Sequence, residues 1–108
     1  MEKVFLEQSH QLLQNHFELD SLETTENNKE ALWEMAVAQL SSEIAHLIDN
    51  DFERLLYILY RIDVDEKKVR EALAKSEFDK GPKIIAEMIL LRQMEKIKTR
   101  EAYKKGKL

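Results

Sequence analysis

FERLLYILYRIDV, residues 52 to 64, is the densest apolar stretch of this 108-residue chain and lies midway along it. An α-helix turns by about 100° per residue, so one broad face would carry its large apolar side chains: Phe52, Leu55, Leu56, Leu59 and Ile62. Tyr57, Ile58 and Tyr60 widen this surface beyond the stripe of an ordinary surface helix. Asp51 directly before it is a good N-cap, because its carboxylate can accept a backbone N–H of the first turn. The stretch therefore predicts a buried central helix with both tyrosines in the core.

The composition favours an all-α fold. Only two glycines and one proline occur in the chain, which leaves few turn residues for a sheet-rich protein. Hydrophobic residues at 44% and charged residues at 35% are typical of folded proteins, and good helix formers dominate. We predict a single helical domain over residues 1–108. It is expected to be a bundle of four to five helices with a buried central helix and a long C-terminal helix.

Cysteine content and the lengths of the apolar runs bear on the cellular location. The chain has no cysteine, which excludes disulfides, thiolate catalysis and cysteine-based metal sites. The N-terminal stretch MEKVFLEQSHQ carries Glu2, Lys3 and Glu7 where a secretory signal has an apolar core. No apolar run approaches the roughly 18 residues that a membrane span needs. We therefore expect a cytoplasmic protein with no membrane partner.

Charge is distributed unevenly along the chain. Residues 1–53 carry 2 basic and 12 acidic side chains, a net charge of −10, whereas residues 54–108 carry 15 basic and 9 acidic ones, a net charge of +6. Residues 92–108 alone carry 7 basic and 2 acidic side chains, a net charge of +5. These charges can neutralise one another between antiparallel helices of one chain or across a dimer. Alternatively, the basic tail binds nucleic acid, an acidic protein or a membrane surface, or it serves solubility alone.

Periodicity and capping residues predict five helices. We expect them over residues 3–17 or 3–19, 28–48, 52–64, 64–75 and 82–103. Two capping boxes are predicted, Asn27 with Glu30 and Asp63 with Glu66. Pro82 starts the last helix, because proline at the first helical position loses no needed N–H. Phe78 in the preceding connector is expected to point inward.

The last predicted helix carries apolar residues on two faces. Its expected inner face consists of Ile84, Ile85, Met88, Ile89 and Leu91. A second group lies well round the cylinder and faces either another element of the same chain or a partner, because a bundle of this size rarely covers both faces alone. The predicted partner surface consists of this group and two cations after it: Leu90, Met94, Ile97, Arg100 and Lys104.

Two Glu-x-x-His sequences, Glu7–His10 and Glu43–His46, have the spacing used by dimetal sites in four-helix bundles. Such a site needs all its ligands to face inward. Helical geometry places His46 about 130° from the centre of its inner face and Glu7 on an outer side. We therefore expect no metal site. His16 lies on an inner stripe and is expected to be a buried or half-buried structural histidine that is hydrogen-bonded to a neighbour.

One stretch carries a family resemblance. Residues 46–66, HLIDNDFERLLYILYRIDVDE, resemble a segment of small uncharacterised bacterial all-helical proteins of the form LIxxDFxxLLxILYRIDVxE. The resemblance covers about a fifth of the chain. It implies a bacterial cytoplasmic helical domain, and it implies no activity and no catalytic residue.

The sequence carries no motif of a known catalytic site. The chain has no phosphate-binding loop and no nucleophile turn, so we expect no enzymatic activity and no cofactor. The leading interpretation is a helical-bundle protein that acts through protein–protein contact, as a homodimer. The alternative is a regulator that contacts nucleic acid or another polyanion through residues 92–108, which could protrude or fray. Nucleic acid is the less favoured partner, because the rest of the chain has a net charge of −9 and would repel it.

Overall fold

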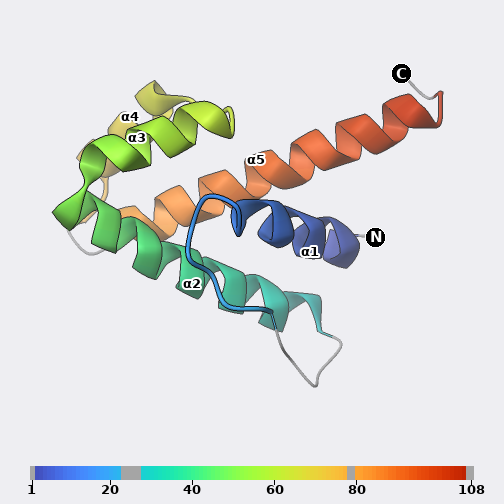
Figure 1. The fold of residues 1–108 in the computed structure, drawn as a ribbon, viewed down its shortest axis with the longest axis horizontal. Helices are drawn as coiled ribbons and strands as arrows, with labels where there is room; N and C mark the ends of the chain where they lie inside the picture. Colours follow the sequence, from blue (N-terminus) through green and yellow to red (C-terminus); the bar gives the residue numbers. More distant parts are fainter. Residues whose placement is uncertain (1, 23–27, 78–79, 107–108) are drawn as a thin grey trace.

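The computed structural model describes residues 2–22, 28–77 and 80–106, and these residues form five α-helices (Figure 1). They are α1 (Glu2–Leu13), α2 (Lys29–Asn50), α3 (Phe52–Arg61), α4 (Glu66–Lys75) and α5 (Gly81–Lys104). No strand occurs among the described residues. The predicted all-α fold with a long C-terminal helix is confirmed.

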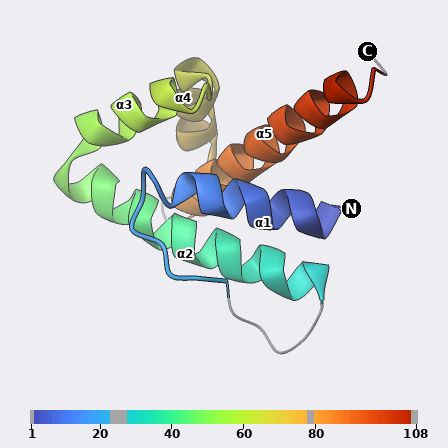
Figure 2. The ribbon, with the colours of Figure 1, turned by 45° about the vertical axis from the view of Figure 1, so that its right-hand side comes forward.

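The bundle is organised around α2 and α5. These two helices diverge from one end of the molecule, and α1 lies in the angle between them (Figures 1 and 2). The shorter helices α3 and α4 lie at the end where α2 stops and α5 begins. In both views the last turns of α5 extend away from the other helices. The core lies between α1, α2 and α5, and its fully buried side chains include Leu6, Leu40, Ile44, Ile85 and Ile89.

The helix α1 ends earlier than predicted, at Leu13. A tight turn follows, in which the backbone N–H of His16 donates to the carbonyl of Leu13 at 3.0 Å. This turn carries Phe17 back into the core, where it is 4% exposed. His16 is half-buried, as expected. The inner residues assigned to one long helix therefore belong to a shorter helix and a turn.

Both α2 and α3 begin with a side-chain cap. Asn28 caps α2, one residue later than predicted, and its Oδ1 accepts the backbone N–H of Glu30 at 2.9 Å. Asn27 and Phe78 lie outside the described residues. Asp51 caps α3 as predicted, because its Oδ1 accepts the backbone N–H of Arg54 at 3.2 Å. Asp51 is the only residue between α2 and α3, so the two helices meet at a tight corner.

One face of α3 is buried, and the opposite face is open. Leu55, Ile58 and Leu59 are at most 3% exposed, whereas Tyr57 and Tyr60 are 62% and 81% exposed. The prediction that both tyrosines lie in the core is therefore wrong. The described helices that pack against α3 are α2 and α4. The other side faces water, where a tyrosine hydroxyl is readily hydrated.

The corner between α3 and α4 differs from the prediction. Asp65 rather than Asp63 caps α4, because its Oδ1 accepts the backbone N–H of Lys67 at 2.9 Å. Asp63 has a φ of 62°, in the left-handed region. Val64 donates its N–H to the carbonyl of Leu59 at 2.9 Å, so α3 ends in a Schellman motif with aspartate where glycine is usual. The reversal leaves the Asp63 carboxylate outside α4.

The helix α5 buries a wide face within its own chain. Its buried residues include Ile85, Ile89, Leu90, Met94 and Ile97, each at most 9% exposed. At about 100° per residue they span roughly half the circumference of the helix. Both α1 and α2 pack against α5. Two neighbours in the same chain therefore cover the two apolar groups that the sequence placed on separate faces.

Candidate interaction surface

The five residues of the predicted partner surface separate in the structure. Leu90, Met94 and Ile97 are 0%, 9% and 6% exposed. This part of the prediction does not hold, because side chains buried under helices of their own chain are not accessible to a partner. Arg100 and Lys104 are exposed near the end of α5. Only the charged part of the predicted surface is therefore accessible.

Leu91 takes the opposite position from the one predicted. It was expected on the inner face of the last helix, but it is 57% exposed. Packing against both α1 and α2 turns Leu90 inward, and the adjacent residue must then point about 100° away. Leu91 is thereby one of the large apolar side chains that the fold leaves in contact with water.

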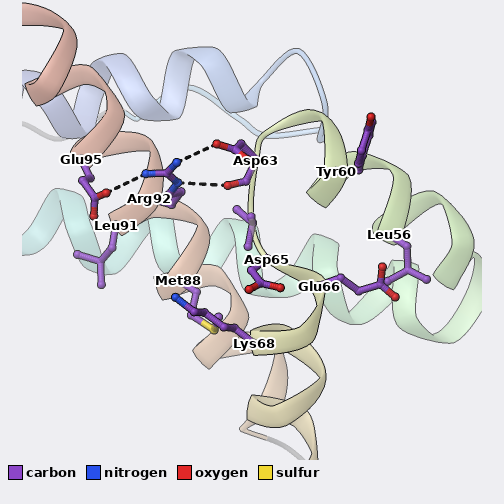
Figure 3. Close-up of a pocket in the computed structure, with 11 residues that line it drawn as sticks. Leu56, Tyr60, Asp63, Asp65, Glu66, Lys68, Met88, Leu91, Arg92 and Glu95 are labelled. Atoms are coloured by element: carbon purple, nitrogen blue, oxygen red, sulfur yellow. Dashed lines mark hydrogen bonds and ion pairs between the residues drawn. The ribbon is translucent and has the colours of Figure 1, made fainter.

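A groove lies beside Leu91 between the α3–α4 corner and α5 (Figure 3). We call it the corner groove, and its volume is about 740 Å³. Its apolar lining consists of Leu56, Tyr60, Val64, Met88 and Leu91, and its charged lining of Asp63, Asp65, Glu66, Lys68, Arg92 and Glu95. The groove thus combines an apolar floor with side chains of both charges.

Arg92 links α5 to the α3–α4 corner across the corner groove. Its Nη2 lies 2.8 Å from Asp63 Oδ2, and its Nε donates to the Asp63 carbonyl at 3.2 Å. Its Nη1 lies 2.8 Å from Glu95 Oε1 (Figure 3). The hydrogen bond to Asp63, together with the two nearby carboxylates, raises the pKa of Arg92 above its usual value. Gln93 adds a buried bond from its Nε2 to the carbonyl of Ile62 at 3.0 Å. The end of α3 is therefore tied to α5.

A second groove lies on the other side of Leu91, between the start of α2 and α5. We call it the Trp33 groove, and its volume is about 920 Å³. Its apolar lining consists of Leu6, Trp33, Leu91 and Met94. Lys29, Glu30, Glu34, Glu95, Lys98 and Thr99 complete the lining. This groove is the more apolar of the two, and it also carries both signs of charge.

The two grooves meet on α5. Leu91 and Glu95, one helical turn apart, line both of them. We define the Leu91 surface by the apolar side chains of the two grooves that are half-buried or exposed: Trp33, Leu56, Tyr60, Met88 and Leu91. Accessible apolar side chains with charged neighbours of both signs are typical of a protein-binding surface.

The metal-site residues suggested by the sequence are not brought together. His10 is buried, and its Nε2 lies 2.7 Å from Gln39 Oε1. Glu43 accepts the backbone N–H of Glu18 at 3.0 Å, whereas His46 is exposed and bonds to its own helix. Among the described residues, no group of three or more histidine or carboxylate side chains is placed to hold a metal ion.

Sequence reasoning missed most of the Leu91 surface. Its residues come from α2, α3 and α5, so no single amphipathic pattern marks it. Among the described residues, no helix is long and apolar enough to cross a membrane. No protein-family model, curated protein or solved structure matches the chain.

Proposed function

We propose that this chain acts without catalysis, through protein–protein contact, and that it forms a homodimer through the Leu91 surface. The observation that carries the proposal is the exposure of Leu91 at the junction of two open grooves. Leu91 projects between the corner groove and the Trp33 groove, so a partner would meet both a projecting apolar side chain and a partly apolar groove that could accept one. A second copy could insert its own Leu91 into one of the two grooves.

The charges around the Leu91 surface favour a second copy as the partner. A two-fold interface brings a surface against itself, so that surface must be self-complementary. The rim of the Trp33 groove carries Lys29 and Lys98 as well as Glu30 and Glu34. A rim with both signs can pair with its own copy, whereas a rim of one sign would repel it. The net charges of −10 and +6 on the two halves of the sequence allow the same kind of pairing on a larger scale.

The monomer exposes more surface than its mass requires. Its accessible surface is 7393 Å², against about 6300 Å² for a compact monomer of 12.8 kDa. Its radius of gyration is 14.2 Å, against about 13 Å for a compact domain of this length. A stable interface buries about 800 Å² on each partner. The excess reflects an elongated molecule, with extents of 41 × 34 × 24 Å, and it leaves room for an interface of that size.

The proposal is tested by Leu91→Glu with Leu12→Glu as the matched control. Leu12 is 43% exposed on α1 and lines neither groove. In a symmetric interface Leu91→Glu would bury two carboxylates, one from each copy, without partners. We expect sedimentation velocity to give twice 12.8 kDa for the wild type and for Leu12→Glu, and 12.8 kDa for Leu91→Glu. A Leu91→Glu protein that sediments as the wild-type dimer would rule out this surface.

The exposed end of α5 supports a second candidate function. Arg100 and Lys104 are exposed in the second half of α5, whose last turns extend away from the other helices (Figure 1), and both could contact nucleic acid or another polyanion. Binding of this kind releases counterions and weakens steeply with salt. Retention on immobilised heparin that falls as the salt concentration rises, and that is lost when residues after Ile97 are removed, would favour this candidate over a dimer without a polyanion partner.

A further inference from the structure

A small hollow lies where the turn after α1, the end of α3 and the second half of α5 meet. Its volume is about 160 Å³. Three cationic side chains line it, namely Arg61 from α3 and Lys96 and Arg100 from α5, together with His16 from the turn. No aspartate or glutamate is among its lining residues. We call it the Arg61 hollow.

Within the described part of the chain, the three cations lack carboxylate partners. Among the described residues, no ion pair joins Arg61, Lys96 or Arg100 to an acidic side chain. Arg92 precedes Lys96 by one helical turn and is, by contrast, paired with two carboxylates. Like charges four residues apart on a helix, such as Lys96 and Arg100, repel one another. The hollow therefore gathers positive charge that the fold itself does not neutralise.

The end of α3 accounts for part of this charge. A helix C-terminus carries the equivalent of about half a negative charge, which favours a cation such as Arg61 in the last turn. Lys96 Nζ also donates to the carbonyl of Ile62 at 3.4 Å. That carbonyl already accepts the shorter bond from Gln93, at 3.0 Å. Half a negative charge does not offset three cations, so an excess of positive charge remains.

We propose that the Arg61 hollow binds a single phosphate group, either the free ion or the terminal group of a small phosphate ester. Arginine presents a planar fork of N–H donors that matches a phosphate, and lysine adds a point charge. The size of the hollow suits one small group rather than a length of polymer. Leu12, Leu13 and Ile97 form an apolar wall that an ester's organic part could contact. This proposal is independent of the dimer, since the hollow shares no lining residue with either groove.

The test is a titration of the full chain, followed by amide chemical shifts, with inorganic phosphate and with glycerol 3-phosphate at constant ionic strength. The variants are Arg61→Gln and Arg100→Gln. The controls are Arg54→Gln on the exposed side of α3 and Lys105→Gln after α5, neither of which lines the hollow. All four positions are exposed, so the variants are expected to fold, and circular dichroism checks this.

We expect saturable binding to the wild type and a Kd at least about tenfold weaker in Arg61→Gln and Arg100→Gln, since each loses a charge-assisted contact. Both controls should stay within about twofold of the wild type. Tighter binding of inorganic phosphate would assign the free ion, tighter binding of the ester would assign an ester, and equal affinities would show that the hollow recognises the phosphate group alone. A wild type that does not saturate, or equal weakening in all four variants, would overturn the proposal. The second result would point to diffuse attraction of anions by the basic end of the chain.

Discussion

Leu90 and Leu91 are neighbours in sequence with opposite environments, and alanine at each position gives a sharp comparison. Leu90 is 0% exposed, and Leu91 is 57% exposed. Truncating a fully buried leucine loses its transfer free energy and leaves a cavity, at a cost of about 3–5 kcal/mol. Less than half of the Leu91 surface is withdrawn from water in the monomer, so its truncation should cost about 1 kcal/mol or less.

Thermal unfolding followed by circular dichroism at 222 nm measures both costs. One kcal/mol corresponds to a Tm shift of about 4–8 °C in a domain near this size, so Leu90→Ala should lower the Tm by at least about 12 °C. Leu91→Ala should lower it by no more than about 8 °C. Scans at several low protein concentrations separate monomer stability from association, because a dimer makes the Tm depend on concentration. Similar small shifts for both variants would refute the packing of α5 against α1 and α2 of its own chain.

Three further outcomes are expected from single sites. Asp63→Gly should match the stability of the wild type within about 0.5 kcal/mol, since glycine relieves the left-handed backbone while the exposed ion pair is lost. Asp63→Ala should be about 1 kcal/mol less stable, because alanine keeps the left-handed strain. Equal urea midpoints for the two variants would contradict this. Gly81→Ala should lose about 1 kcal/mol, because the added Cβ would lie 2.7 Å from Leu73 Cδ2, and Leu73→Ala in the same chain should cancel most of that loss in a double-mutant cycle. Gln93→Leu should cost about 1–2 kcal/mol in urea unfolding, because the carbonyl of Ile62 loses its buried donor and keeps only the longer bond from Lys96, at 3.4 Å; an unchanged midpoint would show that the Gln93 bond does not hold α3 on α5.

The features that the sequence predicted well are those that local chemistry decides. Asp51 caps α3, and Pro82 lies in the first turn of α5, one residue after its start at Gly81, because a capping carboxylate and a fixed proline φ act on the nearest turn alone. Periodicity likewise identified one buried face of α3. The choice between Asp63 and Asp65 as a cap was not decided locally. Both aspartates precede Glu66 closely, and the Schellman reversal at Asp63, which Arg92 supports from α5, selects the second.

The features that failed depend on which neighbour covers which face. Tyr57 and Tyr60 looked like core residues because apolar spacing cannot tell how many helices surround a segment. Leu90 and Leu91 were exchanged for a similar reason: α5 contacts α1 and α2 together, which rotates its buried face relative to the one inferred from its first turns. The Leu91 surface and the Arg61 hollow collect side chains from distant parts of the sequence. Neither leaves a periodic pattern within a single segment.

The molar mass of the wild-type chain in solution tests the central claim most directly. Sedimentation equilibrium over a range of protein concentrations, at low and at high salt, measures it without any substitution. A self-associating chain should approach twice 12.8 kDa as the concentration rises, and the apolar centre of the Leu91 surface should preserve the dimer at high salt, where exposed charges are screened. A mass of 12.8 kDa at every concentration and both salt levels would contradict the homodimer.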